Sequence, residues 1–275
     1  MGHIKKFIRS LVCEKDYLKV ENIKKYINKN NPVIIEIGSN IGTTTSLFLK
    51  TFPEAKIFCF EPDPSLVSRF KNNIKNKNVS LFEFAIGNTN GTTVFFRSSG
   101  LNPLEDRTQS GSIKKPKNHL SQHPDIVFKE KISVPIIRLD DWFKDQNIDE
   151  VDFIWADIQG AEEDLILGAT EVLKKTKYFY TEYSNLEDYE GQISLKKISL
   201  LLNNFFIHRI FSYDVLMVNN NLITFVKKNN FLSEIKIELR KNFIKFWYNK
   251  FFNYPYISLK SRNLTYKRIK MKILF

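Results

Sequence analysis

Along the first part of the chain, short apolar runs alternate with stretches in which apolar side chains recur every three or four positions. Continuous apolar runs at residues 32–37 and 56–60 predict strands that are buried on both faces, and residues 79–85 predict a third strand. The stretches between them, residues 43–51 and 66–75, have the periodicity of helices. Because strand–helix–strand connections are right-handed, this order predicts a doubly wound, Rossmann-like α/β fold with a mostly parallel sheet.

The rest of the chain continues this alternation less regularly. The pattern favours strands at residues 92–96, 132–138, 151–157 and 178–183, helices starting at 139 and covering 160–174 and 195–202, and closing antiparallel strands at 205–211, 215–218 and 222–226. Residues 98–130 are polar and rich in turn-forming residues. A loop of this length in a compact domain is either functional or disordered, and the sequence leaves both readings open.

The length of 275 residues suits one catalytic domain with an appendage. We expect three parts: a helical N-terminal segment at residues 1–30, the α/β domain at residues 31–228, and a basic, aromatic C-terminal extension at residues 229–275. No apolar run reaches the length of a membrane span, and no secretory signal is recognisable at the start. The two cysteines, Cys13 and Cys59, offer no disulfide framework. Together these features predict a cytoplasmic protein.

The formal net charge of +12 resembles that of nucleic-acid-binding proteins, but its position argues against that function. Residues 227–275 hold 13 Lys and Arg and two acids, Glu234 and Glu238, which leaves 42−13 = 29 bases and 30−2 = 28 acids elsewhere. The body of the protein is therefore almost neutral, and a nucleic-acid interface across the whole domain is disfavoured.

A glycine-containing turn after the first strand predicts a cofactor site, because open parallel sheets bind ligands at the carboxyl ends of their strands. Gly38 and Gly42 frame this turn, and Asn40 occupies the position where a dinucleotide fingerprint requires glycine for the approach of a pyrophosphate. This departure argues against NAD or FAD and favours S-adenosylmethionine, which has no phosphate. Glu36 is expected to attract the ammonium group of the cofactor, directly or through a water molecule. Glu61, after the second strand, would accept hydrogen bonds from its ribose, with Phe60 near its adenine.

Several motifs resemble those of the FkbM family of class I methyltransferases over about residues 30–226. They are the segments 34–42, 60–64, 85–88, 139–141, 157–162 and 167–169, together with Glu182. The resemblance implies a seven-stranded Rossmann-like sheet, S-adenosylmethionine as cofactor with Ala85 near it, and O-methylation of a hydroxyl on a sugar or a secondary metabolite. It does not extend to the C-terminal extension.

Three carboxylates are candidates for the chemistry at this edge of the sheet. Asp157 ends one strand, Glu182 ends the next, and Glu162 lies in the first turn of the helix between them. A hydroxyl is a weak nucleophile, so a base or a metal should weaken its bond to the proton. We expect Asp157 to be the base or to position the acceptor. Glu162 could instead complement a helix dipole, Glu182 could be a structural acceptor, and a divalent metal on the three is possible but not favoured.

The long polar segment carries the candidates for binding the acceptor. Ser110, Ser112, Lys114, His119 and His123 could hold a sugar, and the segment could close over it. His208, within an apolar strand, could contact the acceptor or be a structural histidine. The acceptor is expected to be a sugar, a glycan or another hydroxylated small molecule.

The C-terminal extension interleaves aromatic residues with cations at residues 241–252. It could lie on an anionic membrane surface, bind a polyanionic glycan or RNA, or dock as a helix on the domain. An RNA methyltransferase and a non-catalytic cofactor-binding module therefore stay as alternative functions. A dehydrogenase is disfavoured by the glycine pattern.

Overall fold

The computed structural model describes residues 17–102 and 104–223. By its contacts the chain divides into two units, residues 1–226 and 227–275, and the second unit lies outside the described residues. The same holds for the expected helices before residue 17, for most of the closing strand expected at 222–226 and for the C-terminal extension. Leu222, where that strand was expected to begin, lies in a turn.

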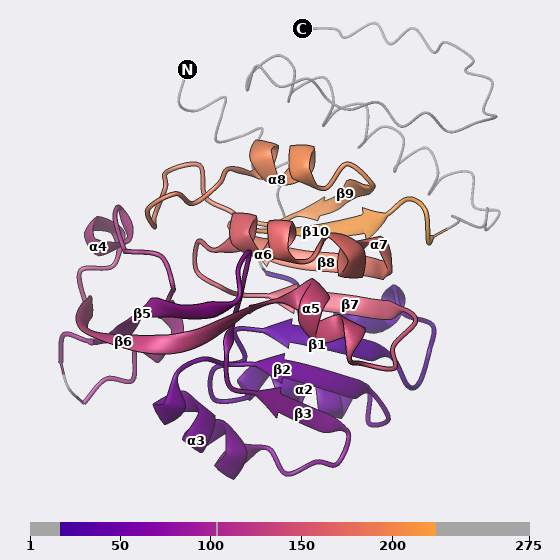
Figure 1. Ribbon diagram of the computed structural model, residues 1–275, viewed down its shortest axis with the longest axis horizontal. Coiled ribbons are helices and arrows are strands. Elements are labelled where there is room, and N and C mark those ends of the chain that lie inside the picture. Colours follow the sequence, from indigo (N-terminus) through magenta and orange to yellow (C-terminus); the bar gives the residue numbers. More distant parts are fainter. Residues whose placement is uncertain (1–16, 103, 224–275) are drawn as a thin grey trace, which may run out of the picture. The chain divides into compact units, whose positions relative to one another are not determined.

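A seven-stranded sheet with the order β3-β2-β1-β7-β8-β10-β9 forms the centre of the described domain (Figure 1). Its strands are β1 (Val33–Ile37), β2 (Lys56–Phe60), β3 (Val79–Phe82), β7 (Val151–Ala156), β8 (Thr176–Glu182), β9 (Phe205–Ile210) and β10 (Asp214–Asn219). β10 runs antiparallel to both of its neighbours, and the other neighbouring strands are parallel. The predicted doubly wound, mostly parallel sheet is confirmed.

Helices cover both faces of this sheet, as the right-handed crossovers require. They are the 3₁₀ helix η1 (Val20–Lys25) and the α-helices α2 (Thr43–Thr51), α3 (Pro64–Asn73), α5 (Leu139–Lys144), α6 (Glu162–Gly168), α7 (Thr170–Lys174) and α8 (Leu195–Leu201). Figure 1 shows α5, α6 and α7 in front of the sheet and α2 behind it. Ile23 of η1, Phe48 of α2 and Phe70 of α3 belong to one buried cluster, so these three elements share the rear face.

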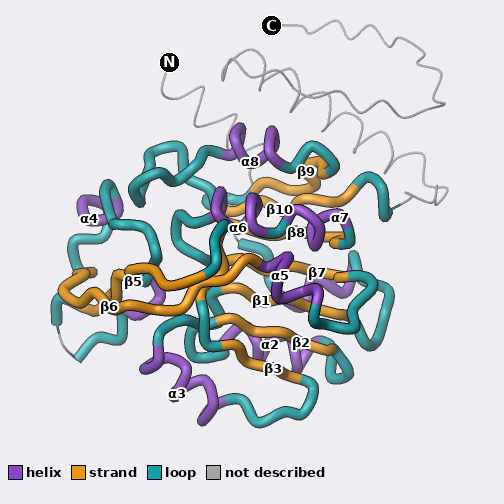
Figure 2. The backbone as a smooth tube through the Cα atoms, in the orientation of Figure 1, coloured by secondary structure: helices purple, strands orange, loops and turns teal. Residues whose placement is uncertain are grey.

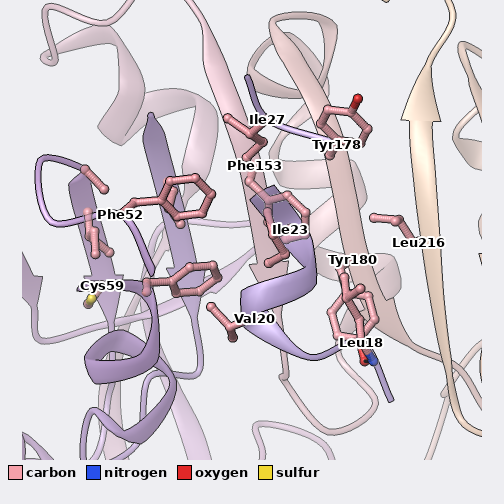
Figure 3. Packing of buried hydrophobic residues seen from close by; sticks show 14 of the residues in the cluster. Leu18, Val20, Ile23, Ile27, Phe52, Cys59, Phe153, Tyr178, Tyr180 and Leu216 are labelled. Atoms are coloured by element: carbon pink, nitrogen blue, oxygen red, sulfur yellow. Dashed lines mark hydrogen bonds between the residues drawn. The ribbon is translucent and has the colours of Figure 1, made fainter. Parts of the chain in front are cut away.

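The rear cluster is one hydrophobic core of the domain, and Figure 3 shows how its side chains meet. Val20 and Ile23 of η1 point toward Phe153 of β7 and Tyr180 of β8, and all four are buried. Burial of such side chains contributes about 1.5–3 kcal/mol each, so this packing stabilises the centre of the sheet. This packing on the rear face supports the strands that end at the carboxyl edge of the sheet.

A second sheet of three strands, in the order β4-β6-β5, corrects two of our predictions. The run at residues 79–85 divides into β3 and the short strand β4 (Ala85–Gly87), which belongs to this second sheet. The loop expected at 98–130 is shorter than predicted, because the long antiparallel strands β5 (Gly91–Gly100) and β6 (Ile126–Arg138) extend into it from both ends (Figure 2). Only the segment between them, with η2 (Thr108–Ser110) and α4 (His119–Gln122), connects the strands.

The helix expected at residues 160–174 is divided into α6 and α7. The division follows Gly168, where a Cβ atom would lie 1.8 Å from the carbonyl oxygen of Gly87 in β4. A glycine is required for this close approach of helix and strand, and Ala169, with φ of −127°, leaves the helical conformation. The contact ties the second sheet to the helical layer near the carboxyl edge.

Candidate active site

The turn after β1 is the first part of the site, and its glycines are required by close packing. Gly38 has φ of +83°, and a Cβ atom there would lie 1.9 Å from the carbonyl oxygen of Asp157. Gly42 has φ of +86°, and a Cβ atom would lie 2.6 Å from the side chain of Ile74. The chain can therefore run this close to β7 and to the end of α3 only with glycine at both positions.

Glu61, directly after β2, is joined to this turn by its carboxylate. Its Oε2 accepts a hydrogen bond of 2.8 Å from the amide of Asn40, and its Oε1 accepts one of 2.9 Å from the amide of Asp63. Burial raises the pKa of Glu61 to about 7. Each carboxylate oxygen has two lone pairs, so both can accept a further hydrogen bond from a ligand.

A cavity of about 310 Å³ opens between this turn and the second sheet. Its volume lies at the lower end of the range for small-molecule sites. Seven of the residues that the sequence singled out line it: Gly38, Asn40, Phe60, Glu61, Ala85, Ser112 and Asp157. The segment between β5 and β6 closes one side of the cavity, where the side-chain amide of Asn40 donates a 3.2 Å hydrogen bond to the carbonyl of Thr108.

Glu36 lies beneath the turn and is not among the lining residues. Successive side chains of a strand point to opposite faces of the sheet. Ile35 and Ile37 face the front of the sheet, so the side chain of Glu36 points to the rear, toward α2. There its Oε2 accepts a 2.6 Å hydrogen bond from the hydroxyl of Thr45, and burial raises its pKa to about 8. Its immediate partner is thus the first turn of α2. Gly42, which precedes α2, likewise shapes the turn without lining the cavity.

Asp157 and Glu182 lie side by side because they follow and end neighbouring parallel strands, β7 and β8. The side-chain amide of Gln159 lies between them, with its nitrogen 2.7 Å from Oδ1 of Asp157 and 2.7 Å from Oε2 of Glu182. Burial raises the pKa of both carboxyls, and the facing Asp157 raises that of Glu182 further. Asp157 lines the cavity, whereas Glu182 lies behind it.

Glu162 and Asp214 extend this acidic group. Glu162 is fully buried; its Oε1 accepts a 3.1 Å hydrogen bond from the amide of Gly160, and its Oε2 has no hydrogen-bond partner. Asp214 begins β10 directly opposite Glu182 and hydrogen-bonds the hydroxyl of Tyr180. Burial raises the pKa of both carboxyls to about 7. The sequence analysis did not select Asp214, because only the pairing of β10 with β8 brings it to this edge.

The segment between β5 and β6 places the acceptor candidates at different depths. Ser112 is buried, lines the cavity and donates a 2.7 Å hydrogen bond to the carbonyl of Gln159. Lys114 is partly exposed and pairs with Asp164. Ser110 and His119 are buried against each other, with the Ser110 hydroxyl 3.1 Å from Nε2 of His119, and do not line the cavity. The ring of His123 lies 4.8 Å from that of His119.

His208 lies apart from this group. Its ring packs edge-on against Tyr26, with the centroids 5.2 Å apart, and β9 is the last strand of the sheet. It is not among the residues that line the cavity. This position matches the structural reading of His208 rather than contact with an acceptor.

In residues 17–102 and 104–223, no group of three or more His, Cys, Asp or Glu side chains has a geometry that could hold a metal ion. Within the same residues, no helix is long and apolar enough to cross a membrane.

A seven-stranded sheet of this order, with an antiparallel strand inserted near one end and a glycine turn opening a cavity at the carboxyl edge, defines a class I methyltransferase. The family model of the methyltransferase FkbM domain matches residues 36–231. The chain therefore belongs to the FkbM family and is an S-adenosylmethionine-dependent methyltransferase.

The chain is similar to several named proteins. The 2-O-methyltransferase NoeI of Sinorhizobium fredii is 44% identical over 190 residues, which cover 68% of this chain and 78% of that protein. Methyltransferase 1 of Beauveria bassiana is 26% identical over 145 residues, 49% of this chain and 57% of that protein. A solved FkbM methyltransferase from Methylobacillus flagellatus is 13% identical, with a TM-score of 0.45 over 76% of this chain and 48% of that chain.

Proposed function

We propose that this enzyme methylates the oxygen of a hydroxyl group on a sugar, a glycan or a similar hydroxylated small molecule. The observation that carries the proposal is the position of Asp157, which lines the cavity beside the glycine turn and lies next to a second carboxylate. The relative NoeI is named a 2-O-methyltransferase, and 2-O-methylation is also a transfer to oxygen.

The residues around the cavity fit S-adenosylmethionine, which supplies a methyl group on a positively charged sulfur when it is bound. Glu61 has free lone pairs for the ribose hydroxyls, while Gly38 and Asn40 present the backbone of the turn. Phe60 and Ala85 lie on the wall where an adenine would pack. We assign Glu36 to the support of α2 rather than to direct contact, because its carboxylate is buried and bound to Thr45.

The buried carboxylates around Asp157 suit a positively charged ligand, because binding of such a ligand would reduce the repulsion between the carboxylates. In the proposed reaction, Asp157 accepts the proton of the acceptor hydroxyl, and the oxygen thereby becomes a stronger nucleophile toward the methyl group. Glu182 and Glu162 act on Asp157 through their charge. Ser112 and Lys114, from the segment that closes the cavity, are the residues we propose for orienting the acceptor.

The test is incubation with S-adenosylmethionine and a panel of methyl glycosides in which each hydroxyl is blocked in turn, followed by mass spectrometry. We expect a mass gain of one methylene on a single hydroxyl with the wild-type enzyme, and a large loss of product with Asp157→Asn. Methylation of RNA or of a protein side chain, with no glycoside product, would contradict the proposed acceptor class.

We also propose that the C-terminal extension contacts an anionic surface, such as a membrane or a polyanionic glycan. The support is its charge, 13 bases against two acids in residues 227–275. Replacement of Lys241, Lys245 and Lys250 with glutamine in the full-length protein should weaken sedimentation with vesicles of anionic lipid at low salt. Equal sedimentation of both proteins, insensitive to salt, would contradict the proposal.

A further inference from the structure

Gln159 holds together the two carboxylates that the proposed function places beside the acceptor. Its side-chain nitrogen lies 2.7 Å from Oδ1 of Asp157 and 2.7 Å from Oε2 of Glu182. A primary amide nitrogen carries two hydrogens, so this one group donates a hydrogen bond to each carboxylate. The sequence motif contains Gln159, but only the side-by-side position of β7 and β8 reveals this double contact.

The backbone of Gln159 is held in an unusual conformation. Its φ is +51°, which is sterically disfavoured for a residue with a side chain, and Gly160 follows with φ of +95°. Ser112 donates a 2.7 Å hydrogen bond to the carbonyl of Gln159, and a Cβ atom on Gly160 would lie 2.6 Å from Cβ of Tyr189. Such conformations persist where the surroundings fix them, and they are common at functional sites.

Tyr189 fixes the other end of the amide. Its hydroxyl lies 3.0 Å from Oε1 of Gln159 and 2.8 Å from the carbonyl of Ser110, so its proton is shared between two acceptors. Tyr189 is only 2% exposed, and its ring packs near that of His119. The amide oxygen therefore faces a donor and the amide nitrogen faces the carboxylates, which fixes the orientation of the group.

The charges around Asp157 and Glu182 make the hydrogen bonds of Gln159 important for the ionisation of this pair. The titratable groups that act on the pair from the neighbouring elements are Glu36, Glu61, Glu162, Tyr180, Tyr189 and Asp214. All of these groups are acids. None of them can therefore neutralise the negative charge that ionisation of Asp157 or Glu182 adds. Hydrogen bonds donated by Gln159 and by the Glu182 carboxyl lower the pKa of Asp157 and oppose this effect.

We propose that Gln159 is a positioning residue that, with its amide oxygen held by Tyr189, aligns Asp157 and Glu182 and keeps Asp157 able to accept a proton. The meaning of this role for catalysis rests on the proposed function. The effect of Gln159 on the two carboxylates can be measured without an acceptor.

The experiment is an NMR titration of the full-length protein with ¹³C-labelled Asp and Glu carboxyl groups, in which Asp157→Asn and Glu182→Gln identify the signals. In Gln159→Met, which removes the donor at similar volume, the midpoints of the coupled pair should rise by roughly one to two pH units. Tyr189→Phe should raise them less. Gln146→Met, in the loop at the opposite edge of the sheet, should leave them unchanged and serves as the matched control.

Gln159→Glu provides a second, isosteric variant in case Gln159→Met does not fold. It replaces the donor with a third carboxyl, and the midpoints should rise at least as far. Midpoints equal to those of the wild type in a folded Gln159 variant would overturn the inference.

Turnover separates this inference from the proposed function. With an active wild-type enzyme, the acid limb of the pH profile of kcat should move up in Gln159→Met, because the base ionises at a higher pH. A wild-type protein that transfers no methyl group, but shows the shifted midpoints, would contradict the proposed function and leave the role of Gln159 standing. An active enzyme with unshifted midpoints would contradict the role of Gln159 and leave the proposed function standing.

Discussion

The two halves of the carboxyl edge are built in different ways. At β1 and β2, the carboxylate of Glu61 is satisfied by backbone amides, those of Asn40 and Asp63. At β7 and β8, Asp157 and Glu182 share the side-chain amide of Gln159. Backbone donors are fixed by the path of the chain, whereas a side-chain donor depends on one residue and its neighbours. We therefore expect the β1–β2 half to tolerate side-chain changes with graded losses, and the β7–β8 half to respond steeply.

The largest effect is expected at the β7–β8 half from Asp157→Asn. If Asp157 is the base, kcat should fall by about 10²- to 10⁴-fold, because the amide cannot take up the proton. The rate is measured as formation of S-adenosylhomocysteine with a glycoside acceptor. Asp149→Asn, an exposed position before β7, is the matched control and should keep wild-type turnover. Wild-type turnover in Asp157→Asn would show that another group accepts the proton.

Gly38→Ala should break the join between the two halves. A methyl group there meets the backbone of Asp157 at 1.9 Å, so the two strand ends must separate. We expect a loss of about 3–5 kcal/mol in the free energy of unfolding, measured with urea. Gly191→Ala is the control for backbone strain alone, since its φ is +78° and nothing lies within 4 Å. It should cost about 1–2 kcal/mol. Equal losses in both variants would contradict the close approach at Gly38.

A graded loss is expected at the β1–β2 half from Glu61→Gln. The variant replaces one acceptor oxygen with a donor, which faces either a backbone amide or the ribose. Affinity for S-adenosylmethionine should fall by about 10- to 100-fold, as for the loss of a hydrogen bond to a charged group. In the wild type, affinity should rise as pH passes about 7, where Glu61 ionises. Glu83→Gln, an exposed carboxylate paired with Lys71, should bind as the wild type does.

The pH dependence of stability should show the acidic character of the β7–β8 half. The pKa of Glu162 is raised from 4.5 to about 7 in the folded state. Its contribution to stability is therefore complete below about pH 4.5 and is lost as pH rises through 7. Glu162→Gln should flatten this decline by about 1–3 kcal/mol between pH 5 and pH 8, as measured by urea unfolding. An unchanged slope would mean that Glu162 ionises at an ordinary pH.

The smallest effects are expected from substitution of His208 and Ser112. His208→Phe keeps an aromatic ring against Tyr26 and should leave kcat and KM unchanged. Ser112→Ala, which loses the hydrogen bond to the carbonyl of Gln159, should lower kcat/KM by about 3- to 10-fold. A larger effect from His208→Phe than from Ser112→Ala would indicate that the acceptor binds near His208 rather than near Ser112.

The β1–β2 half was largely readable from the sequence because its parts are local. The strands were recognisable as continuous apolar runs, and the turn by Gly38 and Gly42. The same local reasoning did not reveal the partner of Glu36, because the alternation of side chains along β1 turns its carboxylate toward Thr45 of α2. Residues of one strand end can thus be identified from sequence, while the face each occupies depends on the layers above and below.

The β7–β8 half was only partly readable because its contacts join distant segments. Asp157 and Glu182 were selected by their positions at the ends of strands and Glu162 by its position in the first turn of a helix, but Tyr189 and Asp214 carried no local signal. The strands β5 and β6 were underestimated because Lys129, Glu130 and Lys131 are exposed, so their polar pattern reads as a loop. The expected helix is interrupted after Gly168, which packs closely against Gly87. The periodicity of the sequence does not reveal this contact.

The most direct test of the central claim is calorimetric titration of S-adenosylmethionine and of NADH into the wild-type protein. Saturable binding of S-adenosylmethionine alone, at one site per chain, is the predicted result, because Asn40 stands where a pyrophosphate-binding turn needs glycine. Binding of NADH in its place, or of neither ligand by the folded protein, would contradict the assignment of this cavity to the methyl donor.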